Sequence, residues 1–338
     1  MAERFHIAEW YGRPFLSLSD TERLECATFR VGGNAMSKAD LARLAELASK
    51  VFLSEREKVR LASLRAALER QQANERPCPF RTDSAHPTCT KPGGVCSLRL
   101  YAEPDGNLSP VDGERGMIRA LCPYRFHQND TVFKAIGRSI FGDEAPIKVG
   151  EVGFLESTGN LDSAQGADVG RIDMILVRSD TPNGFPLEWA AVEIQAVYFS
   201  GKEMKIEFDH IAALLGHPTM PREIRRPDYR SSGPKRLMPQ LQIKVPTLRR
   251  WGKKMVIVVD VPFFQSMGEM RTANHPSNAD IIWVLVDFVE RADSPHLHLE
   301  VVGQHATTLE NAIEGLTGGT PVTRDQFERR IRDKALRP

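Results

Sequence analysis

The fold of this chain is decided by two apolar stretches, GRIDMILVRS at residues 170–179 and LEWAAVEIQAVYF at residues 187–199. Both stretches are rich in β-branched and aromatic residues and are bounded by turn residues, which predicts two strands. The intervening residues 181–184, Thr-Pro-Asn-Gly, predict a hairpin turn that sets these strands side by side. Because predicted helices flank them, the sequence indicates a mixed α/β domain. Further strands are expected at 149–157, 253–261 and 279–288.

Polar residues interrupt these two strands. Asp173 stands in the apolar run Ile-Asp-Met-Ile-Leu-Val, and a buried carboxylate without a partner costs several kcal/mol, so this position requires an explanation. Glu193 and Gln195 are two residues apart on the next strand and therefore project from the same face. The hairpin would bring Asp173 beside them. Two carboxylates on a sheet form an oxygen site that suits Mg²⁺, an ion that can activate a phosphate and a water.

Spacing alone leaves an alternative to a catalytic site. Asp173 and Glu193 could face solvent on an amphipathic sheet, or pair with arginines such as Arg171. A further candidate carboxylate is Glu156, at the end of the preceding predicted strand, for which a role as a surface acid is the alternative.

The cysteines gather in a segment dense in proline, glycine and turn residues, from Arg76 to Pro123. Four of them have the spacing C-x10-C-x6-C-x25-C, without a C-x-x-C pair, so scattered reduced thiols are an alternative to a metal site. Their proline and glycine neighbours favour a metal site, because thiolate sites are commonly built on turns. Four thiolates suit tetrahedral Zn²⁺ or a single iron ion. These cysteines are Cys78, Cys89, Cys96 and Cys122.

Helices are expected at both ends of the chain. Ser37 with Asp40, and Ser54 with Glu57, form capping-box patterns before two leucine-rich stretches, which predicts a helical hairpin over about residues 37–72. The second of these helices is rich in charge, and we interpret it as a solvated face rather than an arm that contacts DNA. Other helices are expected over 131–141, 235–244 and 323–337.

Between Pro221 and Lys254 the chain is strongly basic, with eleven lysines and arginines against two acids, Glu223 and Asp228. Lysine and arginine contacts to phosphates dominate affinity for DNA, and a block of this density fits that role. A solvated surface, with compensating acids elsewhere in space, is the alternative. The candidate DNA-binding residues are Arg225, Arg226, Arg230, Lys235, Arg236, Gln240 and Lys244.

Net charge and the length of apolar runs set broad limits on the partners and the compartment of this protein. The 338 residues carry a formal net charge of +1, which predicts no partner by itself. No apolar run approaches the length of a membrane span and the N-terminus has no signal-peptide core, so we expect a cytoplasmic protein without a membrane partner. Thiols stay reduced in that compartment, which argues against disulfides.

Several of these segments together resemble the NotI family of restriction endonucleases. Gly170-Arg171-Ile172-Asp173 followed by Ala191-Val192-Glu193-Ile194-Gln195 is similar to that family's variant of the PD-(D/E)xK motif, in which Glu-Ile-Gln replaces the usual Glu-x-Lys. The resemblance also covers Cys78-Pro79-Phe80, Gly94-Val95-Cys96, Cys122-Pro123 and the opening motif Ile7-Ala8-Glu9-Trp10-Tyr11-Gly12.

The resemblance implies a site and a domain order. Asp173 and Glu193 would ligate Mg²⁺, and Gln195 would stand where relatives have lysine, although an uncharged amide cannot act as a base. The four cysteines would hold one structural iron, with Zn²⁺ as the alternative. The expected segments are 1–75, the opening motif with the helical hairpin as an insertion; 76–128, the four-cysteine metal-binding unit; and 129–338, the PD-(D/E)xK core.

The function implied is that of a Type II restriction endonuclease, which cuts double-stranded DNA at a GC-rich palindrome as a homodimer. A cognate DNA methyltransferase would belong to the same system. Two alternatives remain open: a repair or mobile-element nuclease of the same fold, and a non-enzymatic DNA-binding protein with a four-cysteine metal site.

Overall fold

The computed structural model describes residues 3–29, 38–50, 52–73, 76–81, 87–158, 168–180, 186–273, 276–291, 294–318 and 322–335. Contacts divide the chain into two compact units. The first unit comprises Met1–Ala135, Ala196–Pro227 and Val286–Val301, and the second comprises Ile136–Gln195, Asp228–Leu285 and Val302–Pro338.

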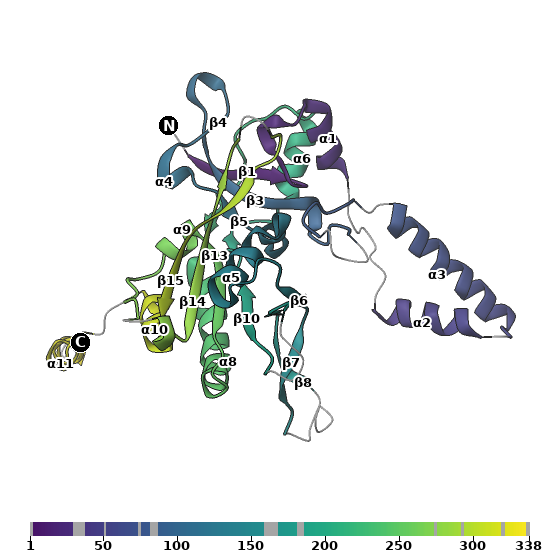
Figure 1. The fold of residues 1–338 in the computed structure, drawn as a ribbon. Coiled ribbons are helices and arrows are strands. Elements are labelled where there is room, and N and C mark those ends of the chain that lie inside the picture. The colour runs from purple at the N-terminus through teal and green to yellow at the C-terminus, as the bar shows by residue number, and fades with distance from the viewer. Residues whose placement is uncertain are drawn as a thin grey trace. The chain divides into compact units, whose positions relative to one another are not determined.

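An antiparallel sheet forms the centre of the first unit (Figure 1). Its strands follow the order β2-β1-β3-β4, and β5 also pairs with β3. Apolar side chains of this sheet form a core in which Trp10 stacks on Phe208 of α6 at 5.3 Å between ring centroids. The bounds are β1 (Arg4–Trp10), β2 (Arg13–Pro14), β3 (Val95–Ala102), β4 (Ser109–Pro110), β5 (Arg119–Ala120), α1 (Asp20–Thr28), α4 (Gly113–Gly116), α6 (Lys205–Ala213), β11 (Phe199–Ser200) and β12 (Arg226–Pro227).

This sheet corrects one expectation from the sequence. The segment 76–128 was expected to be loop-rich and to lack a core, yet β3 within it is largely buried. The reason is its pairing with β1, in which Phe5 lies opposite Leu100. A strand whose partner is this distant along the chain carries no local signal of the pairing.

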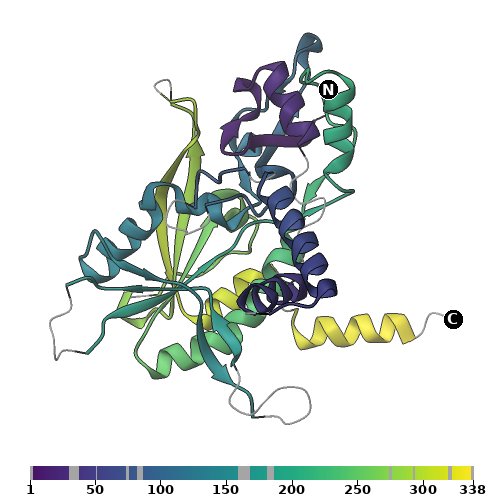
Figure 2. The ribbon, with the colours of Figure 1, turned by 90° about the vertical axis from the view of Figure 1, so that its right-hand side faces the viewer.

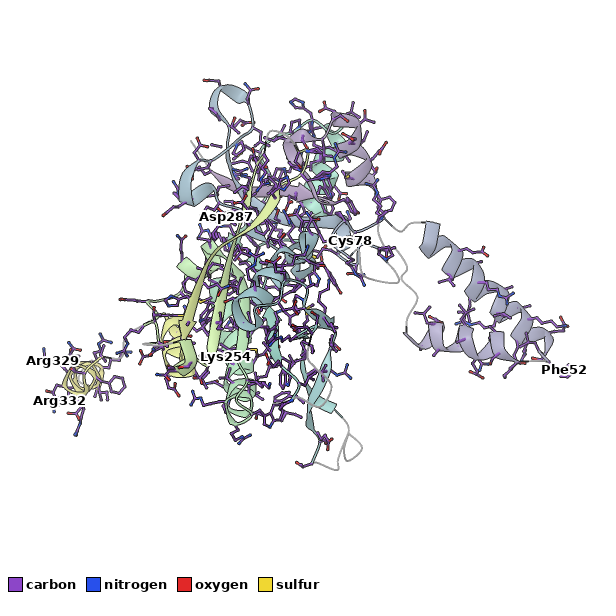
Figure 3. The ribbon with its side chains drawn as sticks, viewed as in Figure 1. Phe52, Cys78, Lys254, Asp287, Arg329 and Arg332 are labelled. Atoms are coloured by element: carbon purple, nitrogen blue, oxygen red, sulfur yellow. The ribbon has the colours of Figure 1, made fainter. Side chains whose placement is uncertain are left out.

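The predicted helical hairpin is confirmed as α2 (Lys38–Ser49) and α3 (Glu55–Ala73). Leu47, Leu61 and Leu64 form its small core, and the predicted capping contacts between Ser54 and Glu57 are present. Phe52, between the two helices, is 90% exposed (Figure 3). Ser37 lies outside the described residues. Several basic side chains of the hairpin pair with acids, which agrees with a solvated face: Lys50–Glu57, Lys58–Glu55 and Arg60–Asp40.

The second unit is organised around a six-stranded sheet with the order β15-β14-β13-β10-β9-β6. β10 is parallel to β13 and antiparallel to β9, so the sheet is mixed, as expected. The strands are β6 (Ile147–Val149), β9 (Met174–Val177), β10 (Trp189–Ile194), β13 (Met255–Asp260), β14 (Ile281–Val289) and β15 (His298–Thr307); the last two contribute residues to both units.

A separate two-stranded ribbon of the second unit, β7 (Val152–Glu156) with β8 (Asp168–Ile172), leads directly into β9 (Figure 2). The predicted strand over 170–179 is therefore two strands that break at Asp173. The predicted turn at 181–184 lies outside the described residues.

The helices confirm most of the local predictions. α5 (Thr131–Phe141) has the bounds expected, and Thr323 caps α11 (Arg324–Ala335) through the amide of Gln326. Arg329 and Arg332 stand on α11, which has no buried residue (Figure 3). The remaining helices are α7 (Tyr229–Ser232), a π-turn (Gly233–Leu237), α8 (Met238–Arg250), α9 (Val261–Gln265) and α10 (Leu309–Thr317). Within the described residues, no helix is long and apolar enough to cross a membrane.

Candidate active site and cysteine cluster

Asp173 and Glu193 lie side by side, as the sequence predicted. Met174 of β9 pairs with Val192 of β10, which places Asp173 next to Glu193 across the two strands. The amide nitrogen of Asp173 lies 3.5 Å from Oε1 of Glu193. The expected burial of Asp173 is wrong: its side chain is exposed, because the strand breaks at this residue. An exposed carboxylate beside a buried one can reach an ion that arrives from solvent.

Glu193 has an unusual electrostatic environment. It is 3% exposed, and burial, together with the neighbouring Asp173, raises its pKa to about 7. Lys244 acts in the opposite direction by favouring the charged carboxylate. A strongly shifted carboxyl beside another carboxylate is typical of a functional site.

Lys244 reaches this pair from α8. Its Nζ donates a hydrogen bond to Oε1 of Glu193 and another, of 3.1 Å, to Oε1 of Gln240 one helical turn away. Gln240 and Lys244, two of the candidate DNA-binding residues, thus share one face of α8. Pro246 lies inside α8 without ending it.

Gln195 follows β10 directly and stays beside the sheet. Its amide nitrogen donates to the carbonyl of Val258 in β13 at 3.0 Å, and its side chain is half-buried. Gln195 is therefore held next to β13, close to Glu193 two residues before it in the chain.

Glu156 lies at the far end of the β7–β8 ribbon. It pairs with Asp168, whereas Val152 pairs with Ile172, so Glu151 is closer in register to Asp173 than Glu156 is. Glu156 lines an apolar cavity of about 690 Å³ within the second unit, together with Trp189 and Trp251. Glu151, which the sequence pattern did not single out, forms an ion pair with Arg171 at 2.9 Å.

The basic segment divides into buried and exposed side chains. Arg225 is 4% exposed and donates to Glu207 at 2.6 Å, so its guanidinium is committed to a buried ion pair in the first unit. Lys244 is committed to Glu193 in the second unit. The candidate side chains that are exposed are Arg226, Arg230, Lys235 and Arg236.

The four clustered cysteines come from two local structures of the first unit. Backbone hydrogen bonds link Cys78 to Pro87 and Cys89 to Arg76, which holds these two cysteines on neighbouring chain segments. The amide of Cys122 donates to the carbonyl of Cys96 at 3.2 Å. Cys78 and Cys96 share an apolar cluster with Phe80, against which Cys89 packs.

The chemistry of this cluster suits a soft metal ion. All five cysteines, Cys26 included, are free thiols. Burial raises the pKa of the Cys89, Cys96 and Cys122 thiols, and nearby cysteine sulfurs contribute to the increase at each. Binding of a metal would therefore release protons from these thiols. Over the described ranges, no group of three or more His, Cys, Asp or Glu side chains has the arrangement of a formed metal site. The donor set thus fits Zn²⁺ or Fe, while its closure around an ion is a prediction.

One comparison with known proteins bears on these sites. The family model described as Restriction endonuclease NotI matches residues 62–299. This span includes both the acid pair and the four cysteines, and it leaves out α2 and α11. No curated protein matches the chain.

Proposed function

The chain belongs to the NotI restriction endonuclease family, and from this premise we propose that it hydrolyses double-stranded DNA at GC-rich palindromes with Mg²⁺. Family membership implies a Type II restriction enzyme that cuts DNA. The target sequence, the metal and the residues that act are parts of the proposal. The observation that carries it is the meeting of Asp173 and Glu193 on adjoining strands, with Gln195 two residues further on.

In this proposal Asp173 and Glu193 hold Mg²⁺ through their carboxylate oxygens, which are the ligands that this ion prefers. A bound Mg²⁺ ion supplies positive charge that polarises the scissile phosphate and acidifies the attacking water. Gln195 orients the water or the phosphate by hydrogen bonds. Because its amide neither gains nor loses a proton near neutral pH, the proton of the water must pass to a carboxylate or to the DNA phosphate.

The cysteine cluster has a separate, structural role in this proposal. Cys78, Cys89, Cys96 and Cys122 would hold one ion, iron by resemblance to the family, with Zn²⁺ as the alternative. A tetrahedral thiolate site would link the chain segments that carry these four cysteines and so stabilise this part of the first unit. Elemental analysis of the purified protein decides between the metals, and a reddish colour with one iron per chain supports the first.

The exposed cations of the basic segment would contact DNA phosphates. Arg226, Arg230, Lys235 and Arg236 support this role by their exposure. Removing one cation that touches a phosphate should lower the dependence of the binding constant on salt by about one unit of the log–log slope. Arg225 and Lys244 would not take part, since both are buried in ion pairs.

The partners follow from the type of enzyme proposed. A palindromic target mirrors a two-fold axis, so a homodimer is expected, which analytical ultracentrifugation measures. A cognate DNA methyltransferase would protect the host genome, and genomic DNA of the source should then resist the enzyme. The second subunit and the methyltransferase are both expected in the cytoplasm.

The decisive experiment digests bacteriophage DNA of known sequence with the purified protein and Mg²⁺ and sequences the ends. Ends at one short palindrome support the proposal. Nicks restricted to mismatches or branches would instead support a repair or mobile-element nuclease. A sequence-specific gel shift without cleavage in any divalent metal would support a non-enzymatic DNA-binding protein.

A further inference from the structure

Another cavity of the second unit lies beside the basic segment. Its volume is about 470 Å³, within the range of cavities that bind small molecules. Three parts of the chain line it: residues within 229–235 of α7 and the π-turn, residues within 263–267 of α9 and the turn after it, and the end of α10. The acid pair and the four clustered cysteines are not among these residues, so neither site accounts for the cavity.

Two stacked aromatic rings form part of the cavity wall. The ring of Tyr229 lies on that of Phe263, with 5.9 Å between the ring centroids and 14° between the ring planes. Both residues line the cavity, where Tyr229 is half-buried. Because each ring holds the other in place, a flat aromatic ligand meets a surface that is already ordered. Bases of nucleic acids stack on such side chains.

Two cations share the cavity with these rings. Arg230 and Lys235 both line it and are exposed. Over the part of the chain that the structure describes, neither of them forms an ion pair. Hydrogen bonds from Ser231 and the charges of Lys235 and Arg230 lower the pKa of Asp228, so both cations lie near this one carboxylate. With Asp228 counted, one positive charge is left over, which favours a phosphate, an anion that both side chains bind.

The end of α10 supplies a different kind of contact. Leu316, Thr317 and Gly318 line the cavity, and Gly318 caps the helix in the left-handed conformation. The last carbonyl groups of a helix lack partners within it and carry partial negative charge, so they accept hydrogen bonds from a ligand. The amino groups of adenine, cytosine and guanine are donors of this kind. A ligand with a base at one end and a phosphate at the other therefore matches both α10 and the cations.

We propose that this cavity binds one nucleotide, with the base against Tyr229 and the phosphate on Arg230 and Lys235. An aromatic base joined to a phosphate occurs both in a free nucleotide and in a DNA strand; the second source rests on the proposed nuclease function. The π-turn leads into α8, and Lys235 precedes Lys244, which contacts Glu193, by nine positions or about 14 Å of helix. About four base pairs of B-DNA span that distance, so a nucleotide of a bound strand can reach the cavity.

The first test titrates the full-length protein with deoxycytidine monophosphate by calorimetry, and separately with inorganic phosphate and with deoxycytidine. The monophosphate should bind at least about tenfold more tightly than either half, because only it reaches both the rings and the cations. Tyr229→Leu and Lys235→Gln should each weaken its binding about tenfold. The matched control Lys205→Gln, which removes an exposed lysine paired with Asp209 on α6, should leave its binding unchanged. Phosphate that binds as tightly as the monophosphate overturns the proposal.

The second test separates the two sources with a short single-stranded oligonucleotide, whose unpaired bases are free to enter the cavity. Fluorescence anisotropy without Mg²⁺ compares the wild-type protein with Tyr229→Leu. If the variant binds the oligonucleotide more weakly and wild type does not bind the monophosphate, the cavity takes a nucleotide of a DNA strand. If only the monophosphate depends on Tyr229, it takes a free nucleotide, and dependence of both probes supports both sources. Binding of neither probe, or binding that Tyr229→Leu leaves unchanged, overturns the proposal.

Further variants separate a loss of contact from a loss of fold. Tyr229→Phe keeps the ring and should retain the wild-type affinity. If Tyr229→Leu does not fold, the double variant Arg230→Gln with Lys235→Gln still decides, because both side chains are exposed, and unchanged binding of the probes overturns the proposal. None of these assays requires cleavage. A protein that binds the monophosphate but never cuts DNA contradicts only the nuclease function, whereas a nuclease that binds neither probe contradicts only the role of the cavity.

Discussion

The amide nitrogen of Asp173, in the break between β8 and β9, lies 3.5 Å from Oε1 of Glu193 on β10. Backbone pairing of Met174 in β9 with Val192 in β10 sets the two acids beside each other. One side chain is exposed and the other buried, which gives two acids of different character at one place. Such a pair can receive a divalent cation from solvent while its inner carboxylate stays fixed.

The first prediction removes each carboxylate without changing its shape. Asp173→Asn and Glu193→Gln should lower the rate of DNA cleavage by on the order of 1000-fold, because each removes an oxygen ligand charge from the site. Binding of DNA, measured by gel shift without Mg²⁺, should persist. The control is Glu188→Gln, an exposed acid just before β10 that pairs with Arg178 at 3.4 Å. Discrete DNA fragments from either site variant would contradict the assignment.

The second prediction concerns the third carboxylate. The β7–β8 ladder pairs Glu156 with Asp168 and Val152 with Ile172, so Glu151, which directly precedes β7, is closer in register to Asp173 than Glu156 is. Glu151→Gln should therefore slow cleavage on the order of 100-fold, as loss of a proton acceptor does, while Glu156→Gln leaves the rate unchanged. Single-turnover assays on the two variants form a matched pair. Slow cleavage by Glu156→Gln together with a normal rate for Glu151→Gln would mean that Glu156, and not Glu151, is the third carboxylate of the site.

Local patterns predicted much of this fold. The apolar run at 253–261 and the helix at 131–141 appear where expected, since burial and capping are signals that neighbouring residues carry. The same holds for Glu193 on β10, whereas Gln195 follows the end of that strand.

The unpredicted features depend on contacts between distant residues. The pairing of β1 with β3 and the ion pair of Lys244 with Glu193 each join residues far apart in the chain. Local propensity carries no information about a partner that only the fold supplies, so Arg225, within a basic run, resembled a residue that contacts DNA. Likewise, the apolar neighbours of Asp173 predicted that it is buried. Its exposure results from the break between β8 and β9, which the local sequence pattern does not show.

The third prediction tests the cysteine cluster. Cys122→Ala should remove the bound ion and destabilise the protein by several kcal/mol or more, because binding to a folded thiolate site adds to folding free energy. Cys26→Ala is the matched control: Cys26 is also buried but accepts a hydrogen bond from Arg76 at 3.2 Å, outside the cluster. Metal content and thermal melting measure both variants. Full metal content in Cys122→Ala, or metal loss in Cys26→Ala, would contradict the four-cysteine site.

The fourth prediction separates two neighbouring arginines. Arg225 forms a buried ion pair with Glu207, whereas Arg226 is exposed. Arg225→Ala should lower the free energy of unfolding by about 3–5 kcal/mol, since it leaves a buried carboxylate without its cation. Arg226→Ala should leave stability unchanged and weaken DNA binding, with a smaller salt slope. Urea unfolding and salt-dependent gel shifts measure the two effects. The opposite pattern would mean that Arg225 is the DNA contact.

The fifth prediction concerns acid stability and His6. The ring is 2% exposed, and within the described residues neither nitrogen has a hydrogen-bond partner. Burial lowers its pKa from 6.5 to about 4, with Glu207 opposing this shift and Arg225 and His210 adding to it. Between these two pKa values, the unfolded chain therefore binds a proton at His6 that the folded protein does not bind. Stability contributed by neutral His6 is complete above pH 6.5 and is lost as the pH falls towards 4.

The size of this effect follows from the shift of the pKa. The decrease in the free energy of unfolding should reach about 3 kcal/mol, because each pKa unit corresponds to about 1.4 kcal/mol. His6→Phe keeps an aromatic ring in contact with Phe15, whose centroid lies 4.8 Å from that of His6. Urea unfolding at neutral and acid pH should then show a shallower fall for His6→Phe than for wild type. His217→Gln, which replaces an exposed histidine, should retain the wild-type slope. Equal slopes for wild type and His6→Phe would mean that another group causes the acid sensitivity.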